Sequence, residues 1–69
     1  MSGAFVLWAW SSRWPNVTQP MRITSGSLRD CRTRQAQFSS DYDDALCGIY
    51  AVGDEPEGLR LQVLERMSP

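Results

Sequence analysis

The sequence predicts an α+β domain of two layers, with one helix packed on an antiparallel sheet of three or four strands in the order β-(β)-α-β-β. Three observations lead to this prediction. An apolar, aromatic run opens the chain, a serine-capped segment with helical periodicity occupies the middle, and two apolar runs with strand-like alternation follow. The 69 residues are expected to form a single domain, residues 1–69, because domains usually contain about 100–150 residues.

The first predicted strand is residues 4–10, AFVLWAW, which is short and rich in aromatic and β-branched side chains. Alternation places apolar side chains on both of its faces. Either both faces are buried by other segments, or one face is left as an exposed apolar surface. Residues 11–20 contain two prolines and read as a turn or long connection, and residues 20–24 as a short second strand. The two faces of the first strand are Phe5, Leu7 and Ala9, and Val6, Trp8 and Trp10.

A helix is predicted over residues 28–38, because Ser27 can cap its first free amides and Asp30 supplies an acid three residues later. Leu28, Cys31 and Phe38 recur on one stripe at about 100° per residue, which suits packing against a sheet.

The remaining chain is predicted to form a β-hairpin. Residues 39–44 form a polar loop, residues 45–52 the third strand, and residues 53–58 a connection with glycine at both ends and a proline inside. Residues 59–63 alternate most regularly and should pair antiparallel with the third strand, and residues 64–69 should fray.

The residue types that are missing exclude much chemistry. The chain has no histidine, and all seven of its basic residues are arginine. Serine–histidine and cysteine–histidine catalysis, Schiff-base chemistry and histidine metal sites are therefore excluded. Paired carboxylates could serve a glycosidase, but a chain of this length has little material for a cleft. We expect no enzyme activity and no cofactor.

No metal site is expected either. A calcium loop that began at Asp41 would need glycine and glutamate where Leu46 and Val52 stand. Cys31 and Cys47 cannot complete a zinc site by themselves. Free buried thiols are favoured over a bridge in a reducing compartment, although the sequence leaves both alternatives open.

A membrane span is not expected, because the longest apolar run, residues 4–10, falls short of the roughly 20 residues that a span requires. A secretory signal is not expected, because no basic stretch precedes that run. These observations predict a cytoplasmic protein.

Charge is divided unevenly along the chain. Residues 1–40 contain five arginines and one acid, whereas residues 41–69 contain two arginines and seven acids. Two separated groups of carboxylates could imitate phosphates of DNA, or they could be solvated turns, in which aspartate is common. The six candidate partner-binding acids lie in the two loops that flank the third strand: Asp41, Asp43, Asp44, Asp54, Glu55 and Glu57.

Two other functions are weighed against this hypothesis. One is a small nucleic-acid-binding module, which the acidic pI and the scatter of Arg29, Arg32 and Arg34 around the helix disfavour. The other is a structural or assembly protein that dimerises through an open apolar face carrying Trp8 and Trp10, so the chain is expected to be a monomer or a homodimer. The candidate aromatic interface is Trp8, Trp10 and Trp14, with core packing as the alternative, and the candidate arginines are Arg13, Arg22, Arg29, Arg32 and Arg34.

The stretches PMRITSGSLRDC and ALCGIY, in a small α+β chain with acidic loops and no lysine or histidine, resemble the type I anti-CRISPR proteins of phages and mobile elements. This resemblance implies a non-enzymatic inhibitor that acts by occlusion. Its partner would be a DNA-binding subunit of a CRISPR–Cas effector, the large subunit that reads the protospacer-adjacent motif.

Overall fold

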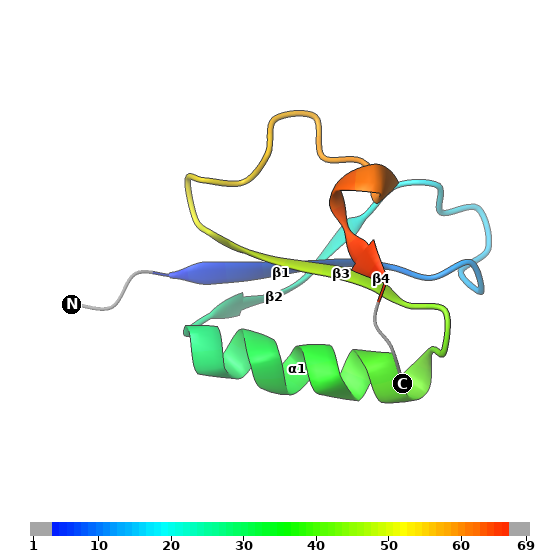
Figure 1. Ribbon diagram of the computed structural model, residues 1–69, viewed down its shortest axis with the longest axis horizontal. Coiled ribbons are helices and arrows are strands. Elements are labelled where there is room, and N and C mark those ends of the chain that lie inside the picture. The colour runs from blue at the N-terminus through cyan, green and yellow to red at the C-terminus, as the bar shows by residue number, and fades with distance from the viewer. Residues whose placement is uncertain (1–3, 67–69) are drawn as a thin grey trace.

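The computed structural model describes residues 4–66, and β1 (Phe5–Trp10) lies inside its antiparallel sheet, whose strand order is β2-β1-β3-β4 (Figure 1). β2 (Met21–Gly26) pairs with one edge of β1, and β3 (Leu46–Ala51) pairs with the other along its whole length. The predicted α+β fold is confirmed, with one helix packed on the sheet. The predicted second and third strands each differ by one or two residues from the observed ends.

α1 (Leu28–Asp41) begins where the sequence predicts and ends three residues later. The Ser27 hydroxyl accepts a hydrogen bond from the Asp30 amide at 3.1 Å, which confirms the predicted cap. The last turn is held by Phe38 and Tyr42, whose ring centroids are 4.9 Å apart at the i, i+4 spacing. The prediction that residues 39–41 belong to a loop is therefore wrong, and Asp41 is helical.

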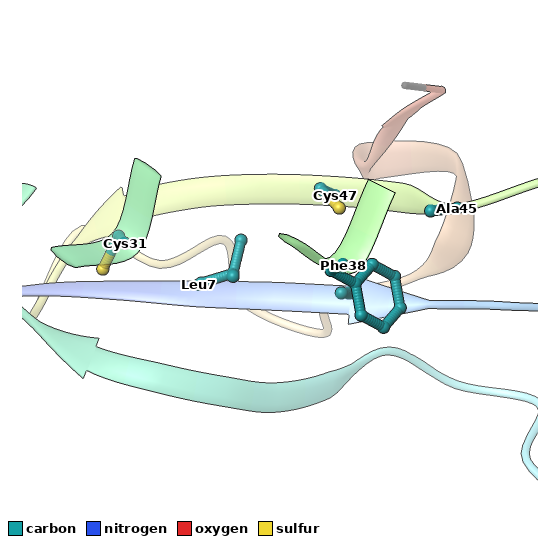
Figure 2. Packing of buried hydrophobic residues seen from close by; sticks show 6 residues of the cluster. Leu7, Cys31, Phe38, Ala45 and Cys47 are labelled. Carbon is teal, nitrogen blue, oxygen red and sulfur yellow. The ribbon is translucent and has the colours of Figure 1, made fainter. Parts of the chain in front are cut away.

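The core lies between α1 and the sheet, on the face of β1 that carries Leu7 and Ala9. Both side chains are fully buried, as is Cys31 of α1 (Figure 2). Phe38 of α1 and Cys47 of β3 complete the same cluster near the other end of the helix. Of the predicted helical stripe, Cys31 and Phe38 are buried in this cluster, whereas Leu28 at the start of α1 is exposed.

The second face of the sheet is covered by the chain's own loops, so of the two alternatives that the sequence leaves open for β1 the structure has both faces covered. Val6, on this face, is fully buried, and the segment 52–64 passes over the side of the sheet away from α1 (Figure 1). Trp8 and Trp10 are half-buried there, and each indole donates a hydrogen bond to a loop. A 69-residue chain with one helix thus uses loops as a third, irregular layer.

The prediction of a strand over residues 59–63 is wrong. Leu61–Val63 forms a 3₁₀ turn, with the Leu64 amide bonded to the Leu61 carbonyl at 3.0 Å. β4 is a two-residue strand, Glu65–Arg66, that pairs antiparallel with the start of β3 and lies in the segment expected to fray; residues 67–69 lie outside the described part. The alternation of residues 59–63 does not reflect a buried face of a strand, because the buried side chain of this segment is Leu64, which lies outside the pattern.

Both cysteines are free and buried, which settles the alternative that the sequence leaves open in favour of thiols. Cys31 lies in the first turn of α1 and Cys47 near the start of β3, with Leu7 between them in the view of Figure 2. Burial raises the pKa of the Cys47 thiol to about 11. Burial, and then the neighbouring Asp30 carboxylate, raises the pKa of the Cys31 thiol.

We therefore predict that both thiols react with a disulfide reagent at pH 8 only when the protein unfolds. The raised pKa of Cys47 lowers its thiolate fraction about a hundredfold relative to an ordinary thiol, and burial blocks access in addition. The measurement is the rate of thionitrobenzoate release with and without urea. Rapid release in native buffer would show that the core opens far more readily than its packing indicates.

Candidate functional site

The first acidic group begins at the end of α1 and leads into β3, and its members differ in what they contact. Asp44 is half-buried and bridges to the turn that follows β1. Its carboxylate accepts hydrogen bonds from the Ser11 hydroxyl at 2.8 Å, from the Ser12 amide at 3.1 Å and from the Ser12 hydroxyl. Ser11 itself is fully buried. Asp44 therefore ties the end of β1 to the start of β3.

The electrostatics of Asp44 follow from these bonds. The Ser12 hydroxyl, and next the Ser11 hydroxyl, hold the pKa of Asp44 below its usual range because they stabilise the charged form. The ionised Asp44 carboxylate therefore attaches the loop before β3 to the serines that follow β1. A carboxylate whose acceptor sites are used in this way is less available to a partner than the sequence suggests.

Asp43 and Asp41 are more exposed than Asp44. Asp43 forms an ion pair with Arg13 at 3.2 Å, but both side chains remain largely in solvent, where such pairs contribute little. Asp41 occupies the last turn of α1, which carries no basic residue, and it has no side-chain partner among residues 4–66. A negative charge at the C-terminal end of a helix opposes the helix dipole. Helix stability therefore gives no reason for this acid.

Three aromatic side chains form a cluster at Tyr42, which lies between Asp41 and Asp43 in the chain. Trp14 contacts Phe38 edge-on, with ring centroids 5.4 Å apart, and contacts Tyr42 at 5.9 Å. Trp14 packs against the core in this way. Of the alternatives weighed for this tryptophan, the structure favours packing over an exposed interface anchor.

The second acidic loop crosses the opposite face of the sheet and is tied to it through Glu55. The Glu55 carboxylate accepts a hydrogen bond from the Trp8 indole at 2.5 Å, and its other oxygen lies 3.5 Å from the Arg22 guanidinium. Trp8 and Arg22 are opposite each other in the β1–β2 ladder. Asp54 and Glu57, on either side of Glu55, are exposed and have no side-chain partner in residues 4–66.

The structure therefore sorts the six predicted acids into two kinds. Asp44 and Glu55 attach the loops to β1, with Asp43 paired more weakly at the surface. The first group lies at the C-terminal end of α1, and the loop with the second group crosses the face of the sheet away from α1 (Figure 1). The unpaired acids that project into solvent are Asp41, Asp54 and Glu57.

The arginines do not gather on one surface. Arg13 and Arg22 are paired with acids of the two loops. Arg29 and Arg32 are exposed on α1, whereas Arg34 is half-buried, and its Nη1 atom is buried without a hydrogen-bond partner in the described structure. The pairing of two of the five candidate arginines leaves less free positive charge than the sequence suggests.

Sequence reasoning missed the groups that bind the acids. Ser11 and Ser12 carry no motif, and they lie more than 30 positions from Asp44 in the chain. In the span 4–66 no cluster of histidine, cysteine or acidic residues is suited to a metal ion. Nor does any helix of that span reach the length and apolar character needed to cross a bilayer.

Comparison with protein-family models, with curated proteins and with solved structures found no match to this chain.

We predict that Asp44→Asn lowers the thermal midpoint at pH 7 by about 5 °C, because it removes the ionised acceptor that holds Ser11 and Ser12. A depressed pKa contributes stability above the ordinary value of about 4 and loses it as the pH falls through the folded-state value. The difference between the two proteins should therefore shrink as the pH falls below about 4. Calorimetry across this range measures it, with Asp54→Asn as the control that leaves the midpoint unchanged.

We also predict that Asp41→Arg raises the free energy of unfolding by about 0.5 kcal/mol at low salt, because it places a positive charge at the C-terminal end of α1. Urea unfolding measures the gain. Asp30→Arg, the matched change in the first turn, should lower stability. Equal effects of the two substitutions would contradict the dipole argument.

Proposed function

We propose that this chain is a non-enzymatic inhibitor that binds a cationic, nucleic-acid-recognising surface of a protein partner through its two acidic groups. The observation that carries the proposal is that some of the acids attach the loops to the sheet whereas others are exposed and unpaired. Asp44 and Glu55 hold the two loops against β1, while Asp41, Asp54 and Glu57 project into solvent without partners in residues 4–66. A loop that is already held in place loses less conformational entropy when its exposed carboxylates bind a partner than a mobile loop does.

The placement of the two groups also bears on the shape of the partner site. The groups occupy opposite sides of a body whose principal extents are 37 × 26 × 17 Å. Duplex nucleic acid also carries its phosphates on both sides of its axis. A positively charged channel that encloses a duplex could contact both groups, whereas a flat surface could contact one.

The proposed partner follows from the resemblance to type I anti-CRISPR proteins. It is the DNA-binding large subunit of a type I CRISPR effector, at the site that recognises the protospacer-adjacent motif. Binding there would exclude target DNA by occupying its site. The phosphate-mimicking acids would then be Asp41, Asp54 and Glu57, with Asp43 as an added contact, because its ion pair with Arg13 is exposed and easily exchanged.

The test is a gel shift of target DNA by a purified type I effector complex, with increasing amounts of this protein. We expect the protein to reduce the shift, and added salt to weaken its effect. The triple variant D41N/D54N/E57Q should inhibit at least tenfold less well, since it loses three surface charges. Its thermal midpoint should stay within about 2 °C of the parent's, because none of the three carboxylates has a side-chain partner among residues 4–66.

The matched control is Glu65→Gln, which neutralises the acid of residues 41–69 that lies outside both loops. It should leave inhibition unchanged. Full inhibition by the triple variant would refute charge mimicry. Retardation of the DNA by this protein without the effector would instead support the nucleic-acid-binding module.

A further inference from the structure

The outer edge of β3 is paired over only part of its length. β4 covers Leu46 and Cys47, and its direction, from Glu65 to Arg66, leads away from the rest of the strand (Figure 1). The Val52 amide bonds the Ala4 carbonyl at 2.9 Å, which fixes the alternation of the β1–β3 ladder.

By this alternation, the even-numbered residues of β3 exchange backbone hydrogen bonds with β1. The backbone N–H and C=O groups of the odd-numbered residues point away from β1, toward the outer edge of the sheet. Cys47 uses its outward groups on β4. The next outward residue, Ile49, has no strand beside it within residues 4–66, because the chain that could pair there forms the 3₁₀ turn Leu61–Val63. The backbone N–H and C=O of Ile49 thus face an open edge.

A groove of about 500 Å³ runs along this open edge, between α1 and the strand. Two apolar side chains at its sides, Leu28 of α1 and Val63 of the 3₁₀ turn, are each 37% exposed. An added strand would direct alternate side chains toward the helix side and toward the opposite side of the sheet. The lining residues that the argument uses are Phe5, Leu28, Arg32, Ile49, Tyr50 and Val63.

Glu65 of β4 lines the groove where β4 pairs with Cys47, whereas the charge on the helix side of the groove is positive. Arg32 lines it, and Arg29 lies one turn earlier beside the adjoining hollow. Both guanidinium groups are exposed and neither forms an ion pair with a carboxylate of the described chain. An occupant that carries a carboxylate on its helix-facing side would complement these arginines.

We infer that this groove binds an extended, acidic peptide segment of a partner protein, which adds as a strand to β3 beyond β4. Strand addition supplies backbone hydrogen bonds, and alternate side-chain pockets supply selectivity. The open part of β3 centres on Ile49, because Cys47 is paired with β4 and the Ala51 carbonyl accepts a hydrogen bond from the Asp54 amide at 2.9 Å; this length fits a short extended segment. An antiparallel second copy of β3 centred on Ile49 would collide with β4 where Glu65 pairs with Cys47, so a self-dimer fits less well.

This groove is separate from the acidic groups of the proposed function, and the two proposals stand or fall independently. The test is selection of a random linear peptide library on the immobilised full-length protein. We expect the enriched peptides to share one acidic residue among alternating apolar ones. The bound peptide should slow hydrogen exchange of the Ile49 amide at least tenfold, because that amide gains a partner.

The deciding variant is Arg32→Glu, and the matched control is Arg60→Glu, the same charge change at an exposed arginine outside the groove. Arg32→Glu should weaken the selected peptide at least tenfold, whereas R60E and the triple variant D41N/D54N/E57Q should leave its affinity within twofold. The inference is overturned if no peptide is enriched, if the enriched peptides lack an acid, or if R32E binds them as tightly. It is also overturned if Ile49 is protected by concentration-dependent self-association of the protein alone.

Discussion

The structure depends on one constraint: β1 is apolar on both faces, and the chain has one helix with which to cover it. α1 buries Leu7 and Ala9, and the other face, with Val6 and Trp8, must be buried by segments without regular structure. Loops have few apolar side chains and many backbone polar groups, so they need specific polar attachments to stay in place. Those attachments are the bonds of Asp44 to the serines after β1 and of Glu55 to the Trp8 indole.

Much of the fold was predictable because the signals for it are local. The cap at Ser27 and the apolar stripe of α1 depend on residues within one or two turns; the cap is observed, and Cys31 and Phe38 of the stripe are buried while Leu28 is exposed. Residues 59–63 were predicted wrongly because alternation describes spacing only. It cannot show that Leu64 is the residue whose side chain is buried. It also cannot show that the preceding loop must first cross the second face of the sheet. That requirement comes from β1, which is distant in the sequence.

The candidate site was predictable in position but not in role. The sequence places six acids in two loops, and the structure keeps both groups at the surface. Which acids are attached to the fold is decided by Ser11, Ser12, Trp8 and Arg22, all far away in the chain. The open edge at Ile49 had no sequence signal, because it results from the absence of the hairpin that the alternation predicts.

The layer of loops over β1 changes how this protein tolerates insertions. In most small domains extra residues are accepted in long connections, since these pack against little. Here the connection from Val52 to Leu64 serves as a lid over a sheet face, and lengthening it near Glu55 would separate the carboxylate from Trp8. A fused tag or reporter is better placed near Gly58, whose exposed backbone has a φ of +65° and open space around it.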